Sequence, residues 1–209
     1  MIQNIKKSKI FFDIGANLGY YSLIAAKVMD NEGEIVAFEP SKRNYEILVK
    51  DLELNNAVQV RAINAAIFDH DGRVYLKEGN HGGLDKIDTN AGSYQIDCVK
   101  LDNWCFRNGT YPDIMKIDVE GAETFVLEGA REIIEKYKPI IFLSTHGPDT
   151  EKKSLEFLEK FGYSFEKIED NEYICSFIGF KIFSAVNDNK SPSTVNGKAR
   201  KILNKNLLN

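Results

Sequence analysis

The sequence predicts an α/β fold in which an open, mostly parallel sheet carries helices on both faces. Short apolar runs alternate with segments of helical periodicity along most of the 209 residues. An apolar strand, a glycine-spaced turn and a helix start follow one another in residues 11–22. Two more apolar runs end in acidic residues, Glu39 and Asp118. Because ligands bind beyond the carboxyl ends of the strands in such sheets, we expect these three places to form one site.

Residues 11–22, FFDIGANLGYYS, are typical of a cofactor site made from a strand end and a helix N-terminus. Asp13 ends the strand, Gly15 leaves room for a ligand at the backbone, and Gly19 allows close packing of the helix start. One face of this helix carries Tyr21, Ile24, Ala25 and Val28. Asn17 replaces the middle glycine of a dinucleotide fingerprint, which favours a ligand without a phosphate. A plain tight turn is the alternative.

The second strand, residues 35–38, ends at Glu39 and is stopped by Pro40. A carboxylate at this strand end is placed to accept hydrogen bonds from both hydroxyls of a ribose. A solvated loop glutamate is the alternative, but the distance from the first turn favours the ribose. Ser41 is the expected N-cap of a helix through Leu54. The inward side chains of that helix are expected to be Ile47, Leu48 and Leu52.

The third segment is PDIMKIDVEGAE, residues 112–123. Its apolar part, 114–117, is predicted to be a buried strand with Asp118 at the carboxyl end. Asp118, Glu120 and Glu123 then place three carboxylates within six residues, just before a helix. Because a helix N-terminus attracts acidic side chains, Glu120 and Glu123 could instead be partners of the helix dipole. A ligand role is most favoured for Asp118.

The remaining elements continue the alternation of strands and helices. Further strands are expected at 58–63, 74–76, 94–99 and 140–143, with a closing hairpin at 163–168 and 172–178. A Gly-rich loop, residues 79–92, separates the second and third of these strands. Helical spacing is found in Val126, Leu127, Ala130, Ile133, Ile134 and Tyr137, and again in Leu155, Leu158 and Phe161.

Four segments together resemble the FkbM family of S-adenosylmethionine-dependent methyltransferases. They are DIGANLGYYS, FEP, KIDVEGAE and the pair Gly129-Ala130, in the order and at the spacings of that family. INAAIFDHDG (63–72) and VKLDNW (99–104) are similar to family segments that lie between these motifs. The resemblance covers roughly residues 9–180.

This resemblance implies a class I methyltransferase, Rossmann-like fold: a seven-stranded, mostly parallel sheet with helices on both faces and one antiparallel strand near the C-terminal end. It implies S-adenosyl-L-methionine as cofactor and O-methylation, often of sugars or sugar-containing natural products. By position, the methionine and ribose part would be lined by Asp13, Gly15, Ala16, Asn17 and Gly19. Glu39 would hold the ribose hydroxyls, Asn64 and Ala66 would lie near the adenine, and Asp118 would lie near the transferring methyl.

Two departures from the family pattern concern the acceptor pocket. Many members carry a glutamate after the fifth strand, close to a histidine, whereas IIFLSTHG has Ser144 near that position and keeps only His146. About eight residues precede the first strand, where relatives often have a longer segment. Neither departure touches the cofactor motifs.

The candidate catalytic bases are Asp118, Glu120 and His146. A base that removes the hydroxyl proton of an alcohol acceptor helps transfer by ~10²–10⁴-fold. His146 follows strand 140–143 on the ligand edge and titrates near neutrality, although a hydrogen-bonded loop histidine is the alternative. His81, on the Gly-rich loop, could close over the acceptor, but a solvated loop is favoured. A metal site formed by His81, His146 and the carboxylates is a further alternative, but no ligand spacing supports it, so no metal ligand is assigned.

Composition is that of one enzyme domain, expected over residues 1–183, with 43% hydrophobic and 28% charged residues. There is no apolar run near 18 residues to span a membrane, and the N-terminal MIQNIKKSK lacks the apolar stretch of a signal peptide. Cys98, Cys105 and Cys175 lack the spacing of a disulfide or zinc framework. We therefore expect a reducing, cytoplasmic compartment.

Charge is unevenly placed along the chain. Residues 184–209 carry +4 and the whole chain −4, which leaves −8 on residues 1–183. This acidic body argues against a nucleic acid acceptor. The polar, basic tail is expected to be poorly ordered up to about Gly197. Residues 198–208 could form a basic amphipathic helix that docks on a partner or an anionic surface, with a frayed terminus the favoured alternative. The sequence leaves the oligomeric state open.

Three functions remain open at this point. The first is an S-adenosylmethionine-dependent O-methyltransferase that acts on a hydroxyl of a sugar or a glycosylated small molecule. The second is a nucleotide-sugar or NAD-dependent Rossmann enzyme, against which the missing middle glycine counts. The third is a non-catalytic S-adenosylmethionine-binding domain, for which the missing glutamate near His146 and the short N-terminus are the best support.

Overall fold

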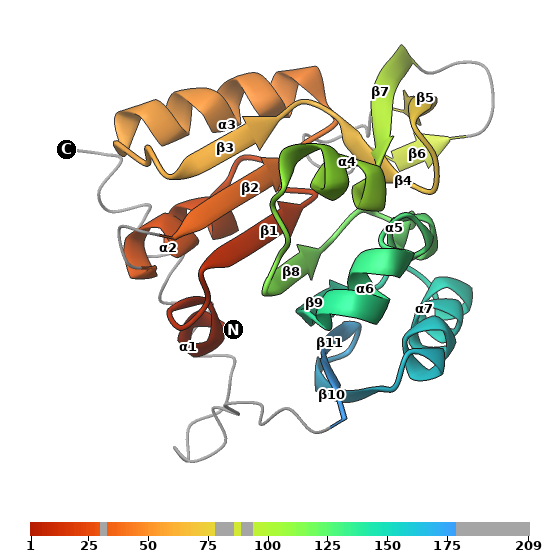
Figure 1. Cartoon of the computed structure of the whole chain (residues 1–209). Helices are drawn as coiled ribbons and strands as arrows, with labels where there is room; N and C mark the ends of the chain where they lie inside the picture. Colours follow the sequence, from red (N-terminus) through yellow and green to blue (C-terminus); the bar gives the residue numbers. More distant parts are fainter. Residues whose placement is uncertain (30–32, 78–85, 89–93, 179–209) are drawn as a thin grey trace.

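The computed structural model describes residues 1–29, 33–77, 86–88 and 94–178, with the backbone alone at 86–88. Within these residues, seven strands form one sheet in the order β10-β11-β9-β8-β1-β2-β3 (Figure 1). The strands are β1 (Ile10–Ile14), β2 (Glu34–Phe38), β3 (Val60–Ile63), β8 (Ile114–Ile117), β9 (Ile140–Ser144), β10 (Tyr163–Glu169) and β11 (Glu172–Phe177). Neighbours run parallel except β11, which is antiparallel to β9 and to β10. The predicted fold is confirmed, including its antiparallel strand near the C-terminal end.

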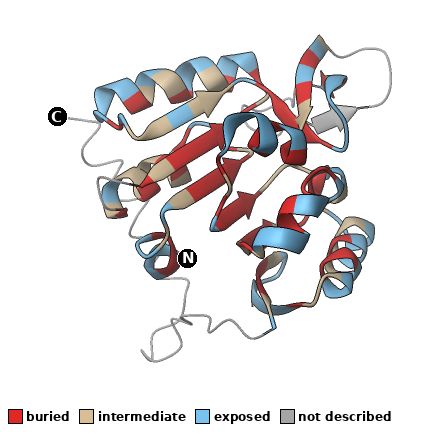
Figure 2. Ribbon diagram, viewed as in Figure 1, coloured by how far each residue is buried: buried red, intermediate tan, exposed pale blue. Residues whose placement is uncertain are grey.

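Helices cover both faces of this sheet because successive side chains of a strand point to opposite faces. On one face, Phe11 and Ile35 pack with α1 (Ile2–Ile5) and α2 (Tyr20–Val28). Ala37 packs there with α3 (Lys42–Leu54). The other face carries α4 (Leu101–Asn108), α5 (Glu123–Gly129), α6 (Arg131–Tyr137) and α7 (Pro148–Lys160). Figure 2 shows the central strands buried between the two helix layers.

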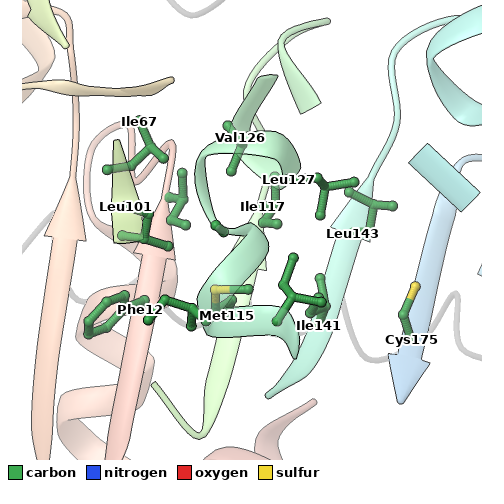
Figure 3. Close-up of a cluster of buried hydrophobic side chains, with 14 of the residues drawn as sticks. Phe12, Ile67, Leu101, Met115, Ile117, Val126, Leu127, Ile141, Leu143 and Cys175 are labelled. Carbon is green, nitrogen blue, oxygen red and sulfur yellow. The ribbon is translucent and has the colours of Figure 1, made fainter. Parts of the chain in front are cut away.

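The larger core cluster lies between the sheet and helices α4–α7 (Figure 3). Strand residues Phe12, Met115 and Ile141 are fully buried there, beside Leu101 and Val126 from the helices. Phe12 and Phe38 both meet the Trp104 ring edge-on, with centroids 5.6 Å and 5.2 Å away. Each fully buried side chain of this size contributes about 1.5–3 kcal/mol. The cluster therefore fixes how β1, β2, β8 and β9 lie side by side.

A smaller sheet lies between β3 and α4 in the sequence, with strand order β4-β7-β5-β6. Its strands are β4 (Ala66–Phe68), β5 (Gly72–Lys77), β6 (Lys86–Asp88) and β7 (Tyr94–Lys100). β5 and β7 confirm the strands predicted at 74–76 and 94–99, whereas β4 and β6 were not predicted. Phe68 stacks on Phe125 at 4.4 Å between ring centroids, which attaches this sheet to α5.

Several predicted details of the helices and strands are wrong. The stripe from Val126 to Tyr137 belongs to two helices, since the backbone of Ala130 leaves the helical region at φ −108° and ψ 12°. Ile47 was expected to point inward but is 36% exposed. The third strand begins at Val60, because residues 56–60 form a turn in which the Val60 N–H donates to the Ala57 carbonyl.

Other expectations concern the cysteines, the tail and the membrane. Cys98, Cys105 and Cys175 are buried and form no disulfide, and burial raises the pKa of Cys105 and Cys175 to about 12. The predicted tail 184–209, His81 and most of the Gly-rich loop lie outside the described residues, so the domain division stays a prediction. In the part of the chain that is described, no helix has the length and apolarity to cross a membrane.

Gly129 offers a test of how the small sheet is attached to α5. A Cβ at this position would lie 2.0 Å from the carbonyl oxygen of Phe68, and a backbone atom cannot rotate away. We predict that Gly129→Ala lowers the free energy of unfolding in urea by roughly 3 kcal/mol, the upper end for overpacking. Gly109→Ala is the control, because nothing lies within 4 Å of its added Cβ. Its left-handed φ of 68° costs only about 1 kcal/mol. Equal losses in the two variants would contradict the contact.

Candidate functional site

The carboxyl ends of β1, β2, β8 and β9 meet at one edge of the large sheet, called here the carboxyl edge. Parallel pairing places Ile14 opposite both Phe38 and Ile117, and Ile117 opposite Leu143. The segments that follow these strands therefore come together, although they lie more than a hundred residues apart in the sequence. These segments contain the predicted residues from Gly15 to Asn17, Glu39, Asp118, Glu120 and His146.

The turn after β1 is packed against its neighbours more tightly than a bare loop would be. A Cβ at Gly15 would lie 2.0 Å from the carbonyl oxygen of Asp118, and one at Gly19 would lie 2.4 Å from Leu48 Cδ1. The φ angles are also left-handed, +79° at Gly15 and +86° at Gly19. The predicted packing role of Gly19 is confirmed. At Gly15 the missing side chain makes room for the backbone after β8, and the close approach of a ligand there stays a prediction.

The amides of this turn point toward β2. The N–H groups of Gly15 and Ala16 both donate to the Phe38 carbonyl at 3.0 Å. The Asn17 N–H donates to Oε2 of Glu39 at 2.7 Å. A pyrophosphate would have to displace these partners and would meet the Glu39 carboxylate. The geometry therefore favours a ligand without phosphates, as the sequence predicted.

Glu39 is a buried carboxylate with 4% of its surface exposed. Its Oε1 accepts a hydrogen bond from the Ser41 N–H at 2.9 Å, while its Oε2 accepts from Asn17. The side chain therefore joins the turn after β1 to the turn after β2. Asn64 supports the same region, because its Nδ2 donates to the carbonyls of Glu39 and Pro40 at 2.8 Å and 3.1 Å.

The side-chain oxygen of Asn17 bears on ligand binding at the turn after β1. Its backbone is left-handed at φ 52°, and its Oδ1 is buried with no hydrogen-bond partner among the described residues. An unmatched buried acceptor costs about 1–3 kcal/mol. A ligand that donates a hydrogen bond at this turn would recover that cost, so the turn fits a cofactor with a donor group.

Lys116 was not singled out from the sequence, yet it lies at the centre of the site's charges. It is 5% exposed in β8, directly opposite Asp13 of β1. Its Nζ lies 3.2 Å from Oδ2 of Asp118 and 3.7 Å from Oδ1 of Asp13, and 4.8 Å from the centroid of the Tyr21 ring. The sequence did contain a sign of this role, because a lysine in an otherwise apolar strand needs a buried acidic partner.

Asp13 is fully buried, and Ser22 Oγ donates to its Oδ2 at 2.7 Å. Burial raises the pKa of Asp13, while Lys116 and the Ser22 hydroxyl oppose that rise. Ala16 and Ala66 are 5% and 3% exposed and pack within apolar clusters. Contacts of Asp13, Ala16 and Ala66 with a cofactor stay predictions.

His146 and two predicted carboxylates converge after β8 and β9. His146 Nε2 lies 3.5 Å from Oε2 of Glu120 and 3.7 Å from Oδ1 of Asp118. The side chains of Asp118, Glu120 and His146 are 34%, 21% and 23% exposed, so the group is open to a small molecule. We name these three residues the acidic–histidine cluster.

Glu123 lies behind this cluster, and the sequence left open whether it takes part in the site or is a partner of the helix dipole. It is fully buried, and its Oε1 contacts His146 Nδ1 at 2.7 Å and accepts from the Gly121 N–H at 3.0 Å. The hydrogen bond with Glu123 raises the pKa of His146, and the charges of Glu120 and Asp118 act in the same direction against burial. His146 thus has a carboxylate partner from α5, although Ser144 replaces the glutamate expected after β9.

The loop that carries His146 is held by hydrogen bonds to the turn of the β10–β11 hairpin. Thr145 donates through its N–H and Oγ1 to the Asn171 carbonyl at 2.9 Å and 3.2 Å. Asn171 Nδ2 donates back to the Thr145 carbonyl at 2.9 Å. Gly147, at φ 107°, then leads into α7. The β10–β11 hairpin therefore fixes the histidine against Glu123.

Comparison with known proteins agrees with the sequence motifs. Residues 13–173 match the family described as the methyltransferase FkbM domain. The methyltransferase sdnD of Sordaria araneosa is 26% identical, over 63% of this chain and 64% of its own length. The residues of the family match include Asp13, the turn after β1, Glu39 and the segments that carry Asp118, Glu120 and His146.

Two solved structures share the fold. The methyltransferase FkbM of Methylobacillus flagellatus KT has a TM-score of 0.62 and 18% identity, over 81% of this chain and 44% of its own. The fibrillarin of Aeropyrum pernix, solved with S-adenosyl-L-methionine bound, has a TM-score of 0.53 and 11% identity, over 83% of this chain and 68% of its own. The chain thus spans less than two thirds of sdnD and less than half of the Methylobacillus protein.

Glu39 gives a prediction about stability in the absence of any ligand. Glu39→Gln replaces one carboxylate oxygen by an NH₂ group that cannot accept from a backbone N–H. We predict a loss of about 2–3 kcal/mol in the free energy of unfolding, as for a hydrogen bond to a charged group. Glu34→Gln, at the other end of the same strand, is the control and should change it by less than about 0.5 kcal/mol. A Glu39 variant as stable as this control would show that the carboxylate does not join the two turns.

Proposed function

The chain belongs to the FkbM methyltransferase family, and on that premise we propose that it transfers the methyl group of S-adenosylmethionine to a hydroxyl of a sugar or a glycosylated small molecule. The observation that carries the proposal is the meeting, at one edge of the sheet, of the Asn17–Glu39 turn pair with the acidic–histidine cluster. The first group suits a nucleoside cofactor and the second suits an acceptor that must lose a proton.

The cofactor half rests on Asn17 and Glu39. The buried, unmatched Oδ1 of Asn17 would accept a hydrogen bond from the amino acid or ribose part. Glu39, oriented by two backbone amides, would accept from the ribose hydroxyls. The bound cofactor would supply an electrophilic methyl group on a positively charged sulfur. The family match and the S-adenosylmethionine bound by the Aeropyrum fibrillarin support this choice of cofactor.

The acceptor half rests on the acidic–histidine cluster. Methyl transfer from a sulfonium is an in-line displacement, so alignment of the two reactants can be worth ~7–11 kcal/mol. An alcohol is a poor nucleophile, and help with its proton adds ~10²–10⁴-fold. Asp118, Glu120 and His146 would contact the hydroxyl, while Glu123 acts as a positioning residue that fixes the imidazole. This need for activation favours an oxygen acceptor over an amine, which would need less help.

The acceptor class is supported by charge. Residues 1–183 carry −8, and Asp118, Glu120 and Glu123 add local negative charge at the site, so a phosphate-rich acceptor would be repelled. A neutral, hydroxyl-rich molecule is compatible with this field. The three buried, unpaired cysteine thiols are consistent with the proposed reducing, cytoplasmic setting.

Cofactor choice can be tested by calorimetry. S-adenosylhomocysteine should bind one molecule per chain, while NAD should give no heat. Asn17→Gly keeps the left-handed backbone and removes the unmatched oxygen, so it should weaken S-adenosylhomocysteine about tenfold, in line with one hydrogen bond. Asn56→Gly is the matched control, with a similar φ of 50° away from the site, and should bind as the wild type does. Binding of NAD in place of S-adenosylhomocysteine would refute the proposal.

Catalysis can be tested separately from cofactor binding. His146→Asn should lower methyl transfer by at least ~10²-fold, because it removes the group that Glu123 positions, and should leave S-adenosylhomocysteine affinity within about twofold. The rate is measured as release of S-adenosylhomocysteine with acceptors from a panel of monosaccharides and glycosides. His70→Asn, at an exposed histidine paired with Asp69, is the control. If cofactor binds while no acceptor is methylated by the wild type, a non-catalytic binding domain is favoured instead.

A further inference from the structure

The acidic–histidine cluster has the composition of a cation site. Asp118, Glu120 and His146 each offer one ligand atom, and these three atoms lie within 4.8 Å of one another. Ligands of one divalent transition metal stand at about 2.0–2.2 Å from it, hence roughly 3 Å apart when adjacent. The distances of 3.5 Å and 3.7 Å from His146 Nε2 to the two carboxylates exceed that only slightly. Small side-chain rotations would bring all three onto one ion.

The His146 ring is also held in the way that the ring of a metal-binding histidine is held. In metal sites the ring nitrogen opposite the metal donates its proton to a carboxylate or a carbonyl, which fixes the tautomer and the ring orientation. Here Glu123 Oε1 contacts Nδ1 at 2.7 Å, so Nε2 is the nitrogen turned toward Asp118 and Glu120. Glu123 is fully buried, and its Oε2 has no hydrogen-bond partner in the described part of the chain.

Carboxyl groups outnumber basic groups around the acidic–histidine cluster. Four carboxylates, Asp13, Asp118, Glu120 and Glu123, lie around Lys116 and His146. Glu172, opposite Ser144 in the sheet, places a further carboxyl group near Asp118 and Lys116. Lys116 is shared between Asp13 and Oδ2 of Asp118, which leaves Oδ1 of Asp118 facing the histidine. A divalent ion at the cluster would offset the excess negative charge.

We propose that Asp118 Oδ1, Glu120 Oε2 and His146 Nε2 bind one divalent cation that holds the acceptor hydroxyl, with Glu123 as the positioning residue behind the histidine. Three protein ligands leave coordination positions open for water or substrate. Mixed imidazole and carboxylate ligands suit Mn²⁺ and its neighbours in the first transition row. The inference rests on the proposed function and deepens it by naming how the cluster activates the hydroxyl.

With a bound cation, methyl transfer to the hydroxyl needs no histidine as base. The cation lowers the pKa of the bound hydroxyl as a Lewis acid, and the proton passes to solvent. The hydroxyl oxygen then forms a bond to the methyl carbon, and the carbon–sulfur bond breaks with its electron pair remaining on sulfur. The products are the methyl ether, S-adenosylhomocysteine and one proton. No oxidant or reductant takes part.

The test is binding of Mn²⁺ alone to the full chain after treatment with a chelator, followed by the loss of the free Mn²⁺ signal in electron paramagnetic resonance. We expect one ion per chain. Glu120→Gln should weaken binding at least ~10-fold, and Glu123→Gln by ~10–100-fold, as for partners that orient a ligand. The matched control is His70→Asn, which removes an exposed histidine paired with one carboxylate, and it should bind Mn²⁺ as the wild type does.

Two results would overturn the inference: no Mn²⁺ bound up to about millimolar concentration, or equal affinity in wild type and Glu120→Gln. Glu120 is partly exposed, so its variant is expected to fold, and S-adenosylhomocysteine titration of the same samples checks this. That titration also separates the two proposals. Cofactor binding without Mn²⁺ binding leaves the methyltransferase function intact and removes the cation, whereas absence of cofactor binding in the wild type refutes the proposed function itself.

Discussion

The pairing of Lys116 with Asp13 and Asp118 is the constraint on which the site depends. An ammonium group 5% exposed in the middle of a sheet requires carboxylates beside it, and the parallel register of β1 and β8 supplies Asp13 directly opposite. The same ammonium holds Oδ2 of Asp118, which leaves Oδ1 turned toward His146. Sliding one strand by a residue would separate the charges and reverse the faces of all its side chains. The pairing therefore links strand register to the direction of a functional carboxylate.

Around this pair, the glycines set how closely neighbouring segments approach. Gly15 lies against the carbonyl of Asp118, Gly19 against Leu48, and Gly129 against the carbonyl of Phe68. The first and third contacts each bring together two segments that carry motifs, and the second packs the start of α2 against α3. The first contact seats the turn after β1 on the backbone of Asp118. The third seats the small sheet on α5, the helix whose first residue, Glu123, holds His146. Packing requirements, which act with or without a ligand, thus account for much of the motif pattern.

The sequence predicted what periodicity and strand ends encode. β8, β9 and the hairpin of β10 and β11 were placed within a residue or two, and Glu39, Asp118 and His146 were assigned to the correct edge because parallel strands end together. It did not predict β4 or α4, which are short and have no full period of apolar residues. Nor did it join Glu123 to His146, because 23 residues and a whole strand separate them. Asp118, Glu120 and His146 were named from the sequence as candidate bases, but no spacing pointed to a metal, because metal motifs are recognised by spacing on one element and this cluster combines two loops.

What the cluster does depends on which cation neutralises it. A proton on His146 is favoured by the hydrogen bond with Glu123 and by the charges of Glu120 and Asp118, and it would form an imidazolium facing those carboxylates. A divalent ion competes for the same nitrogen, since a histidine must lose that proton to bind a metal. The ion offers something the proton cannot, because it has open positions for a substrate oxygen. A protonated imidazole would donate to that oxygen and make it a poorer nucleophile. Productive attack on the methyl group therefore requires either a neutral histidine or a metal in place of the proton.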